Sequence, residues 1–377
     1  MKTLMIIMFA LCFALFVLLI VMTIRLLRAF DRFRIKKPYT TALEAPSVSV
    51  CIPARNETHA MTQCLERVLA SDYEKLEIIV FDDNSVDDTS VLIRSFAHAG
   101  VRFVPGKELP AGWLGKNHAL EVLAREASGT YVMFMDVDTN INTTTISQLV
   151  SYAMTENAEM VSVIPGRADA WRSSVLFGHL RYLWELLLSR KTMPAAASSL
   201  WMINRRTLLD TFEGFTRMSG DVAPESKLAA LLGAGAYRCL VNVPTLGVTY
   251  EKKWLSQMET GRRLLYPMAG GTPLGASAAL VLLGLLNLPF FIVVGGLIFD
   301  WSLLHTLMFA VLLSFMAFYA YYAKHLWARA WLLGGLLWPI VILQEFILMV
   351  ASIWGYARHS ITWKGRPVLA HSVREQK

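Results

Sequence analysis

Long apolar runs lie near both ends of the 377-residue chain and enclose a middle part of mixed character. Residues 4–24 form an uninterrupted apolar run, which as a helix is long enough to cross the roughly 30 Å of bilayer hydrocarbon. Three later runs are also long enough, at residues 274–299, 301–323 and 330–354. The pattern predicts an amino-terminal membrane anchor at residues 1–27 and a group of membrane helices at residues 271–356.

Basic residues crowd beside these apolar runs. A predicted linker, residues 28–46, and a predicted tail, residues 357–377, hold most of them: Arg28, Arg32, Arg34, Lys36, Lys37, Arg358, Lys364, Arg366 and Arg374. Because Lys and Arg collect on the cytoplasmic side of membrane proteins, both segments are predicted to be cytoplasmic. One anchor and three later spans would instead leave the tail outside. Either one run is re-entrant or the charge rule fails here.

Between residues 47 and 250 the pattern changes to short β-branched runs that alternate with stretches of helical spacing. Strands are predicted at residues 48–52, 76–81, 101–104, 131–135 and 160–164. Such alternation predicts an α/β domain whose mainly parallel sheet is covered on both faces. Ligands of such domains bind at the carboxyl ends of the strands.

Two further segments have the texture of helices at a membrane boundary. Residues 251–270 mix Lys and Arg with Trp, Leu and Met, which predicts an amphipathic helix lying in the membrane interface. Residues 173–190 are unusually apolar, and they either line an entrance for an acceptor or cover the sheet. Gln344 and Glu345 lie within the last apolar run, where polar side chains are costly, so we expect them to face other helices or a polar cavity.

The composition supports a membrane protein. Hydrophobic residues make up 55% of the chain and charged residues 17%, against roughly 45–50% and 25% in soluble domains. The net charge of +7 does not indicate a nucleic-acid partner, because no basic block is interleaved with aromatic residues on a polar surface. The position of the basic residues favours anionic lipid headgroups instead.

Acidic side chains follow three of the predicted strands. Glu57 comes after the first strand, Asp83 after the second, and Asp136 and Asp138 after the fourth. Because the carboxyl ends of parallel strands share one edge of the sheet, these carboxylates are expected to converge. Two aspartates at this spacing can bind one Mg²⁺ or Mn²⁺ ion, which keeps positions open for phosphate oxygens. Such an ion would neutralise a diphosphate leaving group.

Three segments, taken together, resemble the family-two, inverting glycosyltransferases of the GT-A fold. They are Val-Ser-Val-Cys-Ile-Pro-Ala-Arg-Asn-Glu from residue 48, Asp-Asp-Asn-Ser-x-Asp-Asp-Thr from residue 82, and Asp-Val-Asp from residue 136. The resemblance covers residues 47–250 and implies a GT-A catalytic domain. It implies a nucleotide-sugar site formed by Pro53, Ala54, Glu57, Asp83 and Asp136. Asp138, together with Asp136, would hold the metal.

A lysine-bearing loop adds to this resemblance. Residues 112–119, Gly-Trp-Leu-Gly-Lys-Asn-His-Ala, are similar to a loop in membrane members of the family that modify lipids. Lys116 at the start of a helix can reach a phosphate, and the amino terminus of the helix also attracts negative charge. Lys116 is therefore a further candidate for binding the nucleotide sugar.

An inverting transfer needs a general base that accepts the proton of the acceptor hydroxyl. The family usually supplies it from a Glu-Asp pair followed three residues later by Leu. Aligning Leu228 with that Leu places Glu225 on the usual Asp and Pro224 on the usual Glu. Glu225 is the first candidate for the base and Asp221 the second, while helix capping is the alternative role for either acid.

The resemblance implies transfer of a single hexose from a UDP-sugar, with UDP-glucose as first choice, to a membrane lipid. The enzyme would be a multi-pass protein of the inner or plasma membrane with a cytoplasmic catalytic domain. A processive polysaccharide synthase is the alternative, but such enzymes carry Gln-x-x-Arg-Trp, and here Gln257 is followed by Arg262 at the wrong spacing. A non-catalytic membrane partner that retains the fold is a third possibility.

Overall fold

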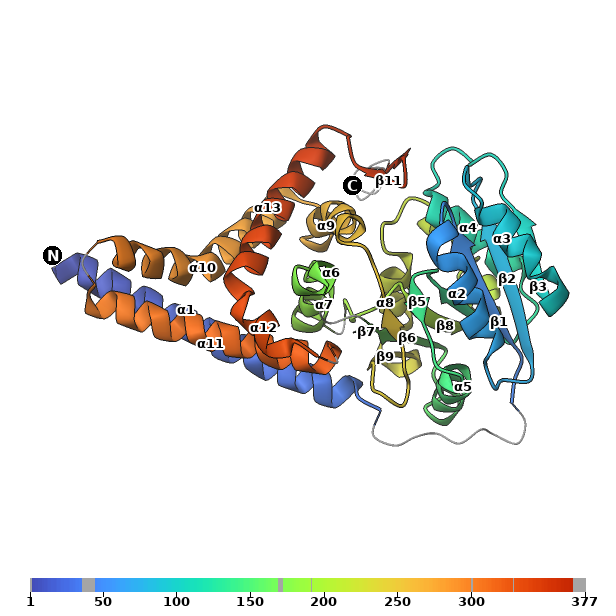
Figure 1. Cartoon of the computed structure of the whole chain (residues 1–377), viewed down its shortest axis with the longest axis horizontal. Coiled ribbons are helices and arrows are strands. Elements are labelled where there is room, and N and C mark those ends of the chain that lie inside the picture. The colour runs from blue at the N-terminus through green and yellow to red at the C-terminus, as the bar shows by residue number, and fades with distance from the viewer. Residues whose placement is uncertain are drawn as a thin grey trace. The chain divides into compact units, whose positions relative to one another are not determined.

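The structure, a computed structural model, describes residues 2–35, 45–168, 172–190, 192–299, 301–327 and 329–368 (Figure 1). Two compact units are present. The sheet unit consists of Phe33–Ala168, Leu188–Glu251 and Lys364–Lys377, and the helical unit of Met1–Arg32, Asp169–Leu187 and Lys252–Trp363. Lys36, Lys37 and Arg374, expected in basic segments, lie outside the described residues.

A seven-stranded sheet forms the centre of the sheet unit as far as the chain is described. Its order is β3 (Val101–Pro105), β2 (Leu76–Asp82), β1 (Val48–Ala54), β4 (Tyr131–Met135), β8 (Leu200–Asn204), β6 (Met160–Ile164) and β9 (Tyr237–Val241). All pairs are parallel except the two that β8 makes. The mainly parallel sheet is therefore confirmed, although β8 and β9 were not expected from the pattern.

Helices cover both faces of this sheet (Figure 1). The helical elements of the unit are α2 (Thr58–Leu69), α3 (Thr89–Ser95), η1 (Ala97–Ala99), α4 (Gly115–Glu126), α5 (Thr145–Thr155), η2 (Thr207–Thr211), η3 (Thr216–Met218) and α8 (Pro224–Ala236). The alternating residues Val48, Val50 and Ile52 of β1 join a core with α2, α3 and α5. Cys51 points to the other face, where its thiol donates to the Leu123 carbonyl of α4. Because successive side chains of β1 point to opposite faces of the sheet, this strand contributes apolar side chains to the layers on both faces.

Three short strands form a second sheet beside the main one. They are β5 (Thr139–Asn140), β10 (Thr249–Tyr250) and β7 (Gly166–Arg167). The Glu251 amide, next to β10, donates to the Asp138 carbonyl at 3.0 Å. This small sheet therefore restrains the backbone that follows β4.

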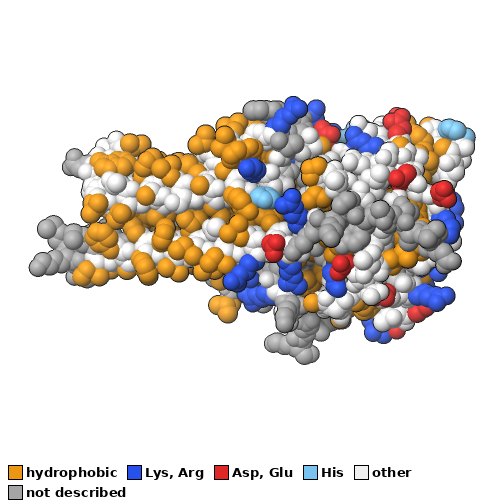
Figure 2. Space-filling view, turned by 90° about the horizontal axis from the view of Figure 1, so that it is seen from below, with side chains coloured by type: hydrophobic (Ala, Val, Ile, Leu, Met, Phe, Trp, Pro, Cys, Tyr) orange, Lys and Arg blue, Asp and Glu red, His pale blue; other side chains and the backbone are white. Residues whose placement is uncertain are grey.

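The helices of the helical unit are α1 (Lys2–Phe33), α6 (Ser173–Leu176), α7 (Arg181–Leu188), α9 (Trp254–Met268), α10 (Pro273–Ile298), α11 (Leu303–Leu326), α12 (Trp331–Leu336) and α13 (Trp338–Ala357). Two short strands, β11 (Thr362–Trp363) and β12 (Arg366–Pro367), follow α13 in the chain. Four helices of the described chain have the length and hydropathy to cross a membrane: Phe9–Phe33, Pro273–Ile298, Leu303–Leu326 and Trp338–Ala357. Figure 2 shows hydrophobic side chains spread over the surface of the long helices.

The last apolar run, residues 330–354, is not one continuous helix. It is divided into α12 and α13 at Leu337, and Pro339 lies in the first turn of α13. Proline is favoured there because that turn has no helical partner for its N–H, so Pro339 begins a helix and does not bend one. Pro289, in contrast, lies inside α10.

Glu345 of α13 ties several segments of the helical unit together. Its side chain is fully buried and accepts hydrogen bonds from His179 Nδ1 at 2.8 Å, the Leu180 amide at 2.8 Å and Trp184 Nε1 at 3.1 Å. Gln344 Nε2 donates to the Phe177 carbonyl at 3.0 Å. As expected, these polar groups face neighbouring helices. Residues 173–187 belong to the helical unit.

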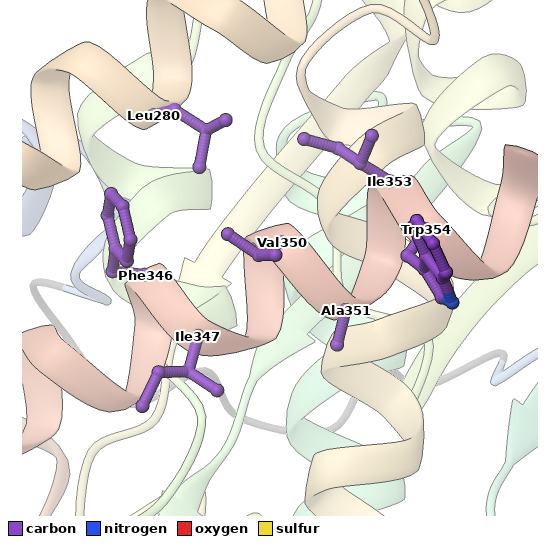
Figure 3. A pocket seen from close by; sticks show the side chains of 7 residues that line it. All are labelled: Leu280, Phe346, Ile347, Val350, Ala351, Ile353 and Trp354. Atoms are coloured by element: carbon purple, nitrogen blue, oxygen red, sulfur yellow. The ribbon is translucent and has the colours of Figure 1, made fainter.

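An apolar groove lies on the surface of α10 and α13. Leu280 of α10 and Phe346, Ile347 and Val350 of α13 line it, together with Ala351, Ile353 and Trp354 (Figure 3). The lining has almost no polar surface. Such a surface is suited to hydrocarbon and not to water.

Candidate active site

The strands that carry the candidate residues end at the same edge of the sheet. Ala54 of β1 pairs with Asp82 of β2. On the other side of β1, Cys51 pairs with Phe134 of β4. The segments that follow these three strands, which hold the predicted acidic residues, therefore start side by side.

Asp82 and Asp83 are both buried but have different partners. The Asp82 carboxylate accepts hydrogen bonds from the Ser85 and Ser90 hydroxyls, which holds the turn after β2. The Asp83 carboxylate accepts from Arg366 Nη1 at 2.8 Å and 2.7 Å. Asp83, and not Asp82, is thus engaged by a group from a distant segment.

Burial raises the pKa of Asp83 above its ordinary value. The positive charge and hydrogen bonds of Arg366 offset part of that rise, and so do the charges of Arg55 and His118. The same surroundings act on His118, whose pKa is lowered by burial although the Asp83 charge opposes the change. Asp83 is therefore a buried carboxyl whose ionised form depends on nearby cations.

Asp87 holds the starts of two helices through its carboxylate. Its carboxylate accepts hydrogen bonds from the Thr58 amide and from the amide and hydroxyl of Thr89. These bonds outweigh burial and lower its pKa to about 2. Asp87 joins the starts of α2 and α3 and shapes the loops beside Asp83.

Glu57 contacts the same distant segment as Asp83. Lys364 Nζ donates to Glu57 Oε1 and, at 2.9 Å, to the Arg55 carbonyl. Arg55 in turn donates to the Asp83 and Asn84 carbonyls. From the sequence, Lys364 and Arg366 indicated only the side of the membrane on which the tail lies. The one feature that could have marked them as site residues is that two cations flank Gly365 shortly after the last apolar run.

Lys116 and Asp136 form an ion pair within the site. Lys116 Nζ lies 2.6 Å from Asp136 Oδ1. The preceding residue, Gly115, begins α4 beside Asp83, since a Cβ added to it would lie 3.0 Å from Asp83 Oδ2 and 3.0 Å from Arg366 Nη1. The start of α4 thus joins the residues after β2 to those after β4, and the structure places Lys116 among the predicted nucleotide-binding acids.

Asp136 and Asp138 are the candidate metal ligands. Burial is the main cause that raises the pKa of the Cys64 thiol, and the charges of Asp138, Glu57 and Asp136 raise it further, so all three carboxylates lie near enough to Cys64 for their charges to act on it. No set of three or more His, Cys, Asp or Glu side chains in the described chain could hold a metal ion. Two hard carboxylates fit a Mg²⁺ or Mn²⁺ ion that takes its other oxygens from a diphosphate and water.

The two candidate bases differ in their surroundings. Asp221 is partly exposed and pairs with Lys227 at 2.8 Å. Glu225 is 2% exposed and lies in the first turn of α8. Pro224 begins this helix. The N-cap residue is Ala223, so neither acid occupies the capping position. Both acids remain candidates for the base.

Asn117 connects the candidate base loop with the lysine loop, and sequence reasoning did not select it. Its buried Nδ2 donates to the carbonyls of Met218 at 2.7 Å, Ser219 at 3.1 Å and Asp221 at 2.8 Å. The Leu114 amide also donates to the Ser219 carbonyl, at 2.9 Å. Because Asn117 follows Lys116 directly, it positions the backbone of Asp221 relative to the Lys116–Asp136 pair.

Comparison with known proteins shows what part of this chain is similar to. Residues 49–197 match the family described as Glycosyl transferase family 2. A mannosyltransferase from Pyrobaculum calidifontis, solved with GDP-mannose and Mn²⁺, has a similar fold, with a TM-score of 0.55 and 20% identity over 92% of this chain and 99% of that one. The expected GT-A fold is thereby confirmed.

Two curated relatives match part of the chain at higher identity. A poly-β-1,6-N-acetyl-D-glucosamine synthase of Staphylococcus aureus is 34% identical over 123 residues, 32% of this chain and 28% of that protein. A GalNAc(5)-diNAcBac-PP-undecaprenol β-1,3-glucosyltransferase of Campylobacter jejuni is 30% identical over 111 residues, 29% of this chain and 35% of that protein. The match therefore spans about a third of each relative's length.

Proposed function

Because residues 49–197 are a family 2 glycosyltransferase domain, we propose that this chain transfers a single hexose from a UDP-sugar to a membrane lipid, with inversion. UDP-glucose is the preferred candidate donor. The observation that carries the proposal is the gathering of Glu57, Asp83, Lys116 and Asp136 at one edge of the sheet. Those groups match the polar and charged parts of a nucleoside diphosphate.

Each part of the donor has a matching group in this site. Asp83 and Glu57 accept hydrogen bonds from the uracil and ribose, beside the backbone of Pro53 and Ala54. Lys116 neutralises phosphate oxygens, and the amino terminus of α4 adds to its field. Asp136 and Asp138 would hold a divalent ion, which would supply charge for the departing diphosphate. Asp136 pairs with Lys116 in the structure and would have to release it to hold the ion.

The acceptor is activated by one carboxylate on the opposite face of the sugar. Glu225 accepts the proton of the acceptor hydroxyl while the hydroxyl oxygen attacks the anomeric carbon and the UDP oxygen leaves with the bonding electrons. The attack inverts the configuration because the nucleophile and the leaving group lie on opposite sides. Asp221, joined to Lys116 through Asn117, is the second candidate for this proton transfer.

A membrane lipid is the acceptor that agrees with the helical unit. The unit carries four helices that are able to span a membrane within the described chain, and an apolar groove on two of them. The Campylobacter relative is named for an acceptor that is linked through diphosphate to undecaprenol, a lipid. A polysaccharide synthase remains the second candidate, because the Staphylococcus relative is one.

Product analysis tests this proposal. We expect protein reconstituted in liposomes with bacterial lipid extract and Mn²⁺ to transfer label from UDP-glucose into a chloroform-soluble product that carries one hexose. The Asp83→Asn variant should be inactive, and the Arg217→Gln variant, changed at an exposed ion pair with Glu213, should behave like wild type. Label in long water-soluble chains would favour the synthase. Absence of transfer from any UDP-sugar in a panel would contradict the proposal.

The contacts of the tail bear on membrane topology. Arg366 binds Asp83, so the tail lies on the same side of the membrane as the sheet unit. The chain between Glu251 and Lys364 must then cross the membrane an even number of times. We infer that α10 and α11 cross and that α13 does not. Buried Glu345 and the strong inclination of α13 to α10 and α11 in Figure 1 support this assignment.

Cysteine labelling tests the topology. The native cysteines are buried, so new exposed ones can be detected with a membrane-impermeant maleimide. We expect Ala111→Cys, in the sheet unit, and Ser360→Cys, after α13, to react from the same, cytoplasmic side, whereas Ser302→Cys, between α10 and α11, reacts from the other. Labelling of Ser360→Cys from the side of Ser302→Cys would mean that α13 crosses.

A further inference from the structure

The segment Lys364–Gly365–Arg366 binds both acids that the proposed function assigns to the nucleoside. Arg366 Nη1 contacts both oxygens of Asp83, and Lys364 Nζ contacts Glu57. Both contacts join residues about three hundred positions apart in the chain, with separations of 283 and 307. Two neighbouring cations thus pair with the two carboxylates of one site.

The Arg366 contact leaves little room for another donor on Asp83. The Asp83 side chain is only 4% exposed, and that of Arg366 is 20% exposed. Arg366 Nη1 also packs against the start of α4, where a Cβ on Gly115 would lie 3.0 Å away. A nucleoside that donates hydrogen bonds to the Asp83 oxygens must therefore move Arg366 aside.

We propose that Lys364–Gly365–Arg366 is a basic latch, which holds the nucleoside part of the donor site closed until a nucleotide displaces it. This inference rests on the proposed function. The latch supplies the cations that a buried carboxylate needs in the empty enzyme, since a buried charge without a partner is strongly unfavourable. The nucleoside N–H and O–H groups take over those hydrogen bonds when the latch opens.

The latch has a calculable cost for donor binding. If the site accepts nucleotide only in its open form, the apparent dissociation constant equals the intrinsic one divided by the open fraction. A latch that is closed in about nine molecules of ten weakens nucleotide binding about tenfold. Loss of the Arg366 cation should remove this tenfold weakening, so that nucleotide binds more tightly. If Arg366 served only as a nucleotide ligand, its loss would instead weaken nucleotide binding.

Nucleotide binding to an Arg366→Gln variant tests the latch. We expect UDP with Mn²⁺, titrated at mildly alkaline pH so that Asp83 stays ionised, to bind this variant about tenfold more tightly than wild type. Arg217→Gln removes an equal charge from an exposed ion pair with Glu213 in the same unit. This variant should bind UDP like wild type. Equal or weaker binding by Arg366→Gln would overturn the latch.

The intact enzyme offers a second test that needs no variant. Trypsin cleaves after Lys364 but not after Arg366, because Pro367 follows Arg366. The closed latch protects the Lys364–Gly365 bond, so UDP with Mn²⁺ is expected to speed release of the carboxyl-terminal peptide, detected by mass spectrometry. Slower cleavage with nucleotide would show that the tail closes over the donor, and the latch would be wrong.

Failure of the latch and failure of the proposed function give different results. If neither wild type nor Arg366→Gln binds any nucleoside diphosphate, the proposed function is wrong and the latch is wrong with it. If both bind UDP with the same affinity, the donor site stands and only the latch is wrong.

Discussion

Replacing Glu225 by Gln is expected to lower kcat by about 10²- to 10⁴-fold, the usual contribution of a general base. The substitution keeps the shape of a buried side chain, so the fold should persist. The dissociation constant for UDP should not change, because Glu225 acts on the acceptor and not on the nucleotide. Turnover measured by UDP release, together with UDP titration, checks both expectations.

The matched variant Asp221→Asn decides between the two acids. Asp221 pairs with Lys227, and its backbone is held by Asn117, so loss of its charge should change turnover much less than loss of Glu225. A large loss in Asp221→Asn with normal turnover in Glu225→Gln would transfer the role to Asp221. Normal turnover in both variants would show that neither Glu225 nor Asp221 is the general base.

Replacing Asp138 by Asn is expected to reduce turnover by about 100- to 1,000-fold, because metal stabilisation of a developing charge contributes several kcal/mol and each 1.36 kcal/mol is tenfold in rate. The neutral amide weakens one of the two carboxylate ligands of the ion. Mn²⁺ affinity should fall with turnover. Electron paramagnetic resonance titration of Mn²⁺ in the presence of UDP measures the first quantity and UDP release the second.

Asp210→Asn is the control for this experiment. Asp210 is an exposed acid of the same unit, so its loss changes the net charge equally and should leave both measurements as in wild type. If Asp138→Asn bound Mn²⁺ and turned over like the control, Asp138 would not be a metal ligand. A loss of turnover with unchanged Mn²⁺ affinity would contradict the metal role as well.

Local patterns were sufficient for most of the architecture. The strands β1, β2, β3, β4 and β6 were expected because a buried parallel strand is a short β-branched run between turn residues. The amphipathic helix α9 was expected within residues 251–270, because charged and apolar residues alternate at helical spacing. Strands β8 and β9 were not expected from the chain, and their pairing with β4 and β6 is seen only in the tertiary structure.

The acidic residues at the sheet edge were found for a similar reason. Glu57, Asp83, Asp136 and Asp138 each lie within three residues of the end of a strand. Parallel strands bring such positions to one edge wherever the strands pair. Residue order alone was enough to group them. The family resemblance then suggested which part of a nucleotide sugar each would meet.

Tertiary structure alone showed which side chains pair with these acids. Arg366 and Lys364 lie 283 and 307 residues from their partners, and Asn117 binds carbonyls about a hundred residues away. Along the chain, the two cations are equivalent to any others beside a membrane helix. Periodicity and turn chemistry depend on near neighbours, whereas an ion pair depends on which distant segments fold together. For that reason the acids of the site could be predicted from the chain, and the cations that now occupy them could not.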